Sequence, residues 1–103
     1  MTEKTLPHVF IGKVSDKALR SFRRLESEIF RDGFLSRREK LVLAVASAVA
    51  VGCDFCVKEL SRKALKEGVR LEELIEAASV AAFVCGGSAF RRASLILDLE
   101  EQV

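Results

Sequence analysis

The stretch Val51-Gly52-Cys53-Asp54-Phe55-Cys56-Val57-Lys58-Glu59-Leu60 joins a long apolar segment, residues 41–51, to a charged amphipathic one, residues 58–67. It holds two of the three cysteines of the chain, in the spacing C-x-x-C. If the stretch is helical, both sulfurs lie on one face, because residues i and i+3 are helix neighbours. Two thiols this close can form a disulfide, share a metal ion or simply pack. Choosing among these uses is the functional question that the sequence poses.

The apolar periodicity and the stop signals around this stretch predict an all-α fold of about five helices. We expect an extended arm over residues 1–14 and a single helical domain over residues 15–103. Ser15 looks like an N-cap, and Ser36 with Glu39 has the spacing of a capping box. The predicted helices cover residues 16–32, 37–51, 53 or 54 to 67, 71–85 and 90–101, with glycines at 33, 52, 68 and 86–87 between them and Ser88 capping the last. The helix over 37–51 is apolar nearly all round, which predicts burial on every side.

Size and composition point to association with further copies. The chain has 103 residues, the length of one domain, and half of them are hydrophobic. A domain this small buries only ~60–70% of the surface of its unfolded chain. We therefore expect some apolar surface to be covered in a homo-oligomer.

The charge pattern does not favour a nucleic-acid partner. The net charge is only +2, from 17 basic and 15 acidic residues. Six arginines are clustered, but acidic residues are mixed among them, so a solvated or interface-forming helix face is the better interpretation. The arginines are at positions 20, 23, 24, 31, 37 and 38, and the acids are Glu26, Glu28 and Asp32.

Nothing in the sequence predicts a membrane protein or a secreted one. The N-terminus leads into no apolar region of a signal peptide. The longest apolar runs, residues 41–51 and 77–87, are well short of the ~20 residues that a membrane span needs. We expect a soluble, cytoplasmic protein. An odd number of cysteines argues against a secreted disulfide framework, and a cytosolic C-x-x-C is more often catalytic or metal-binding.

The cysteine pair favours redox chemistry over a metal site. Zinc or an iron–sulfur cluster needs about four ligands, and the only further candidates are Cys85 and His8, so we expect no metal and no cofactor. Inert packing is a serious alternative, because free cysteine is among the most buried residues. Cys53, however, falls at the first turn of a helix, where unpaired N–H groups and the helix dipole favour a thiolate. Cys85 lies in the apolar run 81–85 and is interpreted as core.

Residues 35–93 carry a resemblance to a known family. The features are Leu35-Ser36-Arg37-Arg38-Glu39-Lys40 before an Ala-rich helix, Gly52-Cys53-Asp54-Phe55-Cys56, Ala64 and Gly68, Glu72-Glu73-Leu74-Ile75, and Ala81-Ala82-Phe83-Val84-Cys85-Gly86-Gly87. This pattern resembles the alkylhydroperoxidase D-like (AhpD-like) branch of the carboxymuconolactone decarboxylase family. The resemblance implies an all-helical domain that assembles as dimers, trimers or hexamers. It also implies that Cys53 and Cys56 are a catalytic, disulfide-forming pair that reduces peroxides or passes electrons to and from a thiol partner protein.

The sequence departs from this family at two positions that matter for catalysis. Active members have a histidine four residues after the second cysteine, where this chain has Leu60. They also have a glutamate twelve residues before the first cysteine, where this chain has Leu41. A peroxidase needs a base to take the thiol proton and an acid to protonate the leaving oxygen, and leucine can do neither. Replacing both members of an interacting pair by apolar groups is nevertheless compatible with keeping the fold.

Nearby groups are poor substitutes for the missing pair. Glu59 neighbours Cys56, but a carboxylate disfavours a thiolate beside it. Glu39 is better used in the capping box, and Lys58 and Arg62 are better interpreted as solvated. His8 could reach the cysteines only if the N-terminal arm, for example of another subunit, folded over them.

The sequence therefore predicts an AhpD-like thiol–disulfide oxidoreductase with weak or absent peroxidase activity. The alternative is a catalytically inactive helical oligomer that serves as a scaffold or interaction module. Decarboxylation of a muconolactone is the weakest of the three, because that branch generally lacks the C-x-x-C.

Overall fold

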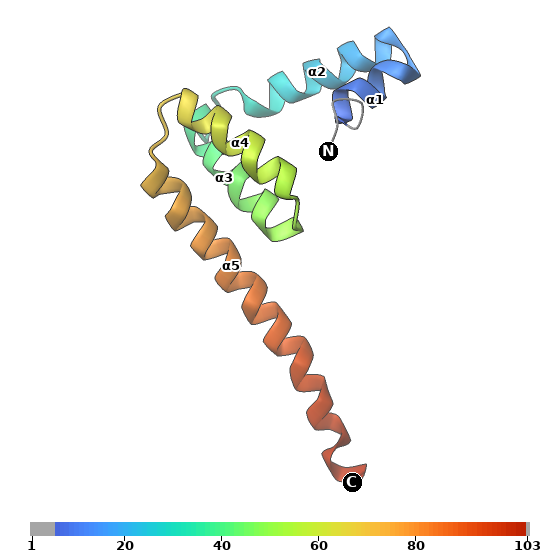
Figure 1. The fold of residues 1–103 in the computed structure, drawn as a ribbon, viewed down its shortest axis with the longest axis vertical. Helices are drawn as coiled ribbons and strands as arrows, with labels where there is room; N and C mark the ends of the chain where they lie inside the picture. Colours follow the sequence, from blue (N-terminus) through green and yellow to red (C-terminus); the bar gives the residue numbers. More distant parts are fainter. Residues whose placement is uncertain (1–5, 103) are drawn as a thin grey trace. The chain divides into compact units, whose positions relative to one another are not determined.

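The computed structural model describes residues 6–102. Over this range the chain is helical and contains no strand (Figure 1). The elements are α1 (Pro7–Val14), α2 (Asp16–Phe30), α3 (Arg37–Val51), α4 (Asp54–Lys66), α5 (Leu71–Ala93) and the 3-10 helix η2 (Ser94–Gln102). The predicted all-α fold with about five helices is confirmed.

The chain forms two compact units, one up to Lys40 and the other from Leu41 onward. In the first unit the predicted extended arm is wrong, because its residues from Pro7 form α1. Proline suits the first position of a helix, where its φ is already helical and its missing N–H is not needed. Residues 1–5 of the predicted arm lie outside the described range. The single domain expected over 15–103 stays a prediction.

Helix α2 begins as predicted and ends earlier than predicted. The Ser15 hydroxyl accepts a hydrogen bond from the backbone N–H of Ala18 at 2.9 Å, which confirms it as the N-cap. The helix stops at Phe30, before Gly33. The Lys40 ammonium group donates to the carbonyls of Ile29 and Arg31, at 2.8 and 2.7 Å. A cation at this end satisfies carbonyls that the helix leaves free.

The capping box that starts α3 is present. The Ser36 N–H donates to the Glu39 carboxylate at 2.9 Å, and the Glu39 N–H donates to the Ser36 hydroxyl at 3.0 Å. The pKa of Glu39 is held below its ordinary value, because the backbone N–H of Ser36, and then its hydroxyl, stabilise the carboxylate.

In the second unit, α3 and α4 form an antiparallel hairpin around a tight turn (Figure 1). Gly52 has φ +76°, a conformation that glycine adopts at little cost, and the Cys53 N–H then donates to the Ala48 carbonyl at 3.0 Å. Gly68, with φ +94°, makes the corresponding turn after α4. The buried apolar residues are Leu41, Val45, Ala48, Ala64, Val69 and Leu74. This small core holds the turn that carries the cysteines.

The structure corrects the prediction that α3 is buried on every side. Leu41, Val45 and Ala48 recur at steps of four and three and form one buried stripe. Leu43 and Val51, on other faces, are 50% and 77% exposed. The apolar composition of α3 predicts that its faces pack against neighbours. Within one copy of this unit, only one face of α3 is buried.

Helix α5 corrects the predicted break at Gly86-Gly87-Ser88. The helix runs through both glycines to Ala93, and only Gly52 and Gly68 have positive φ among the described residues. Glycine inside a helix costs ~1 kcal/mol relative to alanine, which weakens a helix without ending it. Ser88 caps nothing, and its hydroxyl accepts a hydrogen bond from Arg92.

The stretch Leu71–Gln102 is long and apolar enough to cross a membrane, by length and composition only. Core helices of soluble proteins share these properties, so the finding alone does not assign a membrane protein. Within one copy of the chain, most of this stretch is exposed.

Candidate functional site

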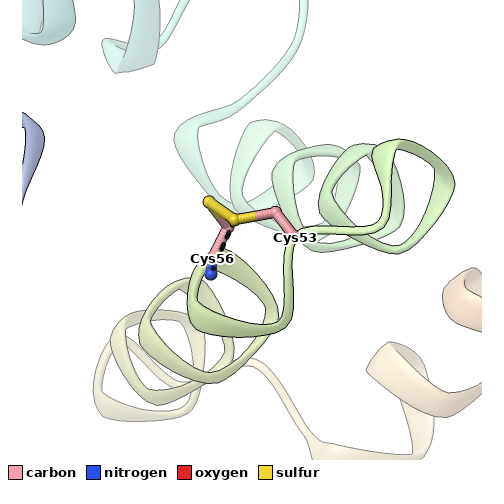
Figure 2. The surroundings of a disulfide bond; sticks show 2 residues. All are labelled: Cys53 and Cys56. Carbon is pink, nitrogen blue, oxygen red and sulfur yellow. Dashed lines mark hydrogen bonds between the residues drawn. A yellow bond between two sulfur atoms is a disulfide. The ribbon is translucent and has the colours of Figure 1, made fainter. Parts of the chain in front are cut away.

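The site is the pair Cys53 and Cys56, whose sulfurs are joined in a disulfide at the start of α4 (Figure 2). Their Cα atoms are 5.2 Å apart, inside the range that disulfides span. The C-x-x-C spacing is compatible with a disulfide, a shared metal ion or simple packing, and the structure contains the disulfide. Both side chains are half-buried, so neither is sealed in the core.

Local backbone geometry places Cys53 at the N-cap of α4. The positive φ of Gly52 turns the chain, and Cys53 then adopts an extended conformation while its carbonyl accepts the Val57 N–H at 2.9 Å. The Cys53 Sγ accepts a hydrogen bond from the Cys56 N–H at 3.1 Å (Figure 2). This is the position where Ser, Thr or Asp normally satisfies a free helix N–H. Free N–H groups and the positive end of the helix dipole are the surroundings that favour a thiolate over a thiol.

A buried and a half-buried leucine occupy the two positions where the resemblance places an acid–base pair. Leu41 is only 1% exposed, among the most buried side chains of the described residues, and Leu60 is half-buried. An ionised carboxylate at the place of Leu41 would need a partner, since an unpaired buried charge is strongly unfavourable.

The nearby charged residues are engaged elsewhere or exposed. Glu59 forms an ion pair with Arg62, and both are exposed, as is Lys58. Glu39 serves the capping box. His8 lies in α1 of the first unit, and its approach to the cysteines stays a prediction. No acid or base from this set is shown to serve the disulfide.

Cys85 is exposed, which corrects its interpretation as core. Its thiol lies on the side of α5 that carries the buried Leu74, and its Sγ is 3.9 Å from the carbonyl oxygen of Ala50 in the last turn of α3. The apolar run around Cys85 suggested burial, but an apolar run gives no information on how much of a helix its neighbours cover. Among residues 6–102, no group of three or more His, Cys, Asp or Glu side chains could hold a metal ion.

The comparisons with known proteins agree with this fold. A model of the carboxymuconolactone decarboxylase family matches residues 16–99. The chain is 32% identical over 83 residues to "Uncharacterized protein 4 in cox locus" of Paracoccus denitrificans, covering 81% of this chain and 75% of that one. It is 31% identical over 87 residues to an uncharacterized protein of Cupriavidus necator, covering 84% and 77% of the two chains.

A crystal structure of a protein from Methanobacterium thermoautotrophicum has the same fold. The TM-score is 0.75 and the sequence identity 39%, over 84% of this chain and 97% of that one. The family match spans most of the chain, including both cysteines and four of the five α-helices found in residues 6–102. This chain belongs to the carboxymuconolactone decarboxylase family.

Proposed function

We propose that the protein is a thiol–disulfide oxidoreductase of the AhpD-like kind, with Cys53 and Cys56 as its redox pair. The observation that carries the proposal is the disulfide between two half-buried cysteines at the N-terminus of α4. Thiol–disulfide exchange requires a thiolate and an accessible sulfur, and no separate acid–base pair. The missing glutamate and histidine are therefore no obstacle to this reaction.

The reaction transfers two electrons between this pair and a disulfide of a partner protein or small thiol. The Cys53 thiolate attacks one sulfur of the external disulfide, a mixed disulfide forms, and the first external thiolate leaves. Cys56 then loses its proton to solvent and attacks the Cys53 sulfur, which releases the second external thiolate. The pair is oxidised to a disulfide, the external disulfide is reduced to two thiols, and a dithiol of the same class returns the pair to its reduced state.

Cys53 is assigned the attack because of its hydrogen bond. The Cys56 N–H points at the Cys53 sulfur, whereas Cys56 itself is the third residue of α4. Stabilisation by a helix N-terminus falls off within the first turn. The thiolate is the nucleophile in exchange, so the sulfur that this N–H stabilises is assigned the attack.

Peroxide reduction is proposed to be weak or absent. Cleavage of the O–O bond leaves an alkoxide or hydroxide that an acid must protonate. Leu41 and Leu60 stand where the family's active members have that acid–base pair, and neither can transfer a proton. We further propose a cytoplasmic protein that works as a homo-oligomer with a thiol partner.

A thiol count tests the proposal. The reduced chain carries three cysteines. After oxidised glutathione followed by removal of excess reagent, we expect one free thiol in the wild type, belonging to Cys85. Cys85→Ser is the matched control and should lose the same two thiols. An intramolecular disulfide that fails to form in the wild type, or that also forms in Cys53→Ser, contradicts the proposal.

The second candidate is a catalytically inactive helical oligomer that acts as a scaffold. It is favoured by the near-complete burial of Leu41, which is consistent with a site that no longer performs acid–base chemistry. In that case the disulfide forms but exchanges with external dithiols no faster than that of an unstructured C-x-x-C peptide. Decarboxylation of a muconolactone remains the third and weakest candidate.

A further inference from the structure

The disulfide lies where α3 ends and α4 begins, in a part of the second unit with few charged side chains (Figure 2). Residues 41–53, which lead into it, contain none. The Sγ of Cys85 is 3.9 Å from the carbonyl oxygen of Ala50, so the middle of α5 lies beside the last turn of α3. Residues 77–90 of α5 are uncharged as well. Among the described residues of the second unit, the charges nearest the disulfide therefore belong to the first turns of α4.

Asp54 carries the charge that adjoins the pair. It directly follows Cys53, as the first residue of α4, and it is exposed. Since consecutive Cα atoms are about 3.8 Å apart and the aspartate side chain is short, its carboxylate lies within about 10 Å of both sulfurs. Charges act on one another over this distance at an ionic strength of about 0.1 M. No ion pair or hydrogen bond of this carboxylate with another residue of the range 6–102 is found.

The other charges of these turns do not contact the Asp54 carboxylate. Glu59 is paired with Arg62, so the two together contribute little net charge at the cysteines. Lys58 is exposed and lies about 200° round the helix from Cys56, and no ion pair between Lys58 and Asp54 is found. The charge that directly adjoins the pair is therefore negative, and it repels an anionic reactant and attracts a cationic one.

We propose that Asp54 makes the Cys53–Cys56 pair selective for exchange partners by their charge. The pair exchanges with disulfides and dithiols whose surroundings are neutral or cationic, and it reacts slowly with anionic ones. A partner protein of this class presents Lys or Arg, and not Asp or Glu, beside its reactive cysteine. This inference rests on the proposed redox function and adds to it the chemical class of the partner. The selection concerns rates, so the pair still equilibrates with glutathione, an anionic thiol, when given time.

The charge acts in both steps of the exchange. The Cys53 thiolate attacks one sulfur of the external disulfide, a bond forms between these two sulfurs, the external S–S bond breaks, and the first external thiolate leaves. Cys56 loses its proton to solvent and attacks the Cys53 sulfur, which releases the second external thiolate. The pair loses two electrons and becomes a disulfide, and the external disulfide gains them and, with two protons from solvent, becomes two thiols. Both external groups pass within reach of the Asp54 carboxylate.

Three small disulfides of different charge test the proposal on the full-length protein. Cystamine is cationic, 2-hydroxyethyl disulfide is neutral, and dithiodiglycolate is anionic. The measurement is the rate at which each oxidises the reduced protein, read by intact mass after acid quenching. In Asp54→Asn at low salt, we expect the rate with dithiodiglycolate, relative to that with cystamine, to rise about 3- to 10-fold over the wild type. The ratio removes any change in the amount of Cys53 thiolate, because that change is common to the three reactions.

Matched variants separate charge from other effects. Asp54→Glu keeps the charge and should keep the wild-type ratio, whereas Asp54→Lys should raise the ratio beyond that of Asp54→Asn. Glu72→Gln removes an exposed acid from the first turn of α5 and should leave the ratio unchanged. Glu72 lies beyond the far end of α4, roughly 18 Å of helix from the cysteines. Added salt should shrink the difference between Asp54→Asn and the wild type, because it screens the charge. Circular dichroism shows that each variant is folded.

The outcomes distinguish this inference from the redox function on which it rests. A ratio that stays the same in Asp54→Asn and Asp54→Lys, or that changes as much in Glu72→Gln, would overturn the selection by charge while the pair still exchanges. A wild-type pair that none of the three disulfides oxidises would overturn the proposed redox function, and this inference with it.

Discussion

The Sγ of Cys53 accepts a hydrogen bond from the backbone N–H of Cys56 at 3.1 Å, while the two sulfurs are bonded to each other. One residue thus closes the first turn of α4 and supplies half of the disulfide. The N–H that satisfies the sulfur in the disulfide remains in place when the disulfide is reduced, because it belongs to the helix backbone. This relationship is the basis for the different roles that we propose for the two cysteines.

The first prediction concerns those roles. Cys56→Ser removes the resolving sulfur and leaves the stabilised thiolate of Cys53. We expect it to accumulate a mixed disulfide with oxidised glutathione, seen as one added glutathione per chain by intact mass spectrometry. The reciprocal variant Cys53→Ser should react much more slowly. Equal rates, or a faster reaction at Cys56, would show that the hydrogen bond does not decide which sulfur attacks.

The second prediction concerns the two leucines. Leu41→Glu places a carboxylate at a site that is 1% exposed, and an unpaired charge there should cost about 3–5 kcal/mol in the free energy of unfolding. Adding Leu60→His supplies a partner and should recover part of this loss. Chemical denaturation of both variants and of Leu60→His measures the coupling by a double-mutant cycle.

The same double variant should gain peroxide reduction, measured as peroxide consumed in the presence of a dithiol. Leu41→Gln with Leu60→Asn is the control for polarity without acid–base capacity. A double variant that regains stability but no activity would mean that the site differs from the family's active members in more than these two groups.

The third prediction concerns the start of α3. Ser36→Ala removes the hydroxyl that accepts the Glu39 N–H, and loss of an N-cap typically costs ~1 kcal/mol in the free energy of unfolding. Ser47→Ala is a matched control on the same helix, since the Ser47 hydroxyl only donates to the Leu43 carbonyl within the helix. Denaturant titration should show a clearly larger loss for Ser36→Ala than for Ser47→Ala.

The fourth prediction is the pH dependence of that cap. Because the pKa of Glu39 is lowered in the folded chain, its contribution is fully present above the unfolded pKa and is lost as the pH falls through the folded pKa. Unfolding free energies measured from neutral to acidic pH should therefore fall less steeply for Glu39→Gln than for the wild type. Parallel curves would contradict a lowered pKa at this residue.

The fifth prediction uses the two kinds of glycine in the second unit. Gly86 is helical, and no atom lies within 4 Å of a Cβ built on it, so Gly86→Ala should stabilise α5 by about 0.5–1 kcal/mol. Gly68 has φ +94°, and Gly68→Ala should instead be destabilising. Thermal unfolding of the two variants should shift in opposite directions.

Local chemistry explains which parts of the fold could be predicted from the sequence. Ser15, Ser36 and the turn at Gly52 act through hydrogen bonds within a few residues, so the caps and the approach of Cys53 to Cys56 follow from spacing alone. The helix from Pro7 could have been found from proline's preference for the first helical position. The short apolar sequence of this segment shows no helical period, which is why the sequence predicts an extended arm there.

Other features depend on neighbours that the sequence does not place. Glycine in a helix carries a modest free-energy cost relative to alanine, and each added helical residue gains a hydrogen bond. Whether a helix ends at Gly86 and Gly87 depends on the balance of these two terms, so the presence of glycine alone does not decide it. The exposure of Cys85 and Phe83 depends on how much of α5 the hairpin covers. The apolar composition of α5 predicts that these residues are buried. It does not say whether the residues that bury them belong to the same chain or to another copy.

The redox role of the cysteine pair is best tested by the equilibrium between its oxidised and reduced forms in glutathione buffers of stepped redox potential, followed by intact mass. For the wild type and for Cys85→Ser, we predict one reversible transition in which the chain loses two hydrogen atoms and gains no glutathione. That transition should disappear in Cys53→Ser and in Cys56→Ser. A wild type that keeps its mass at every potential, or that only accumulates glutathione adducts, would contradict a working redox pair at Cys53 and Cys56.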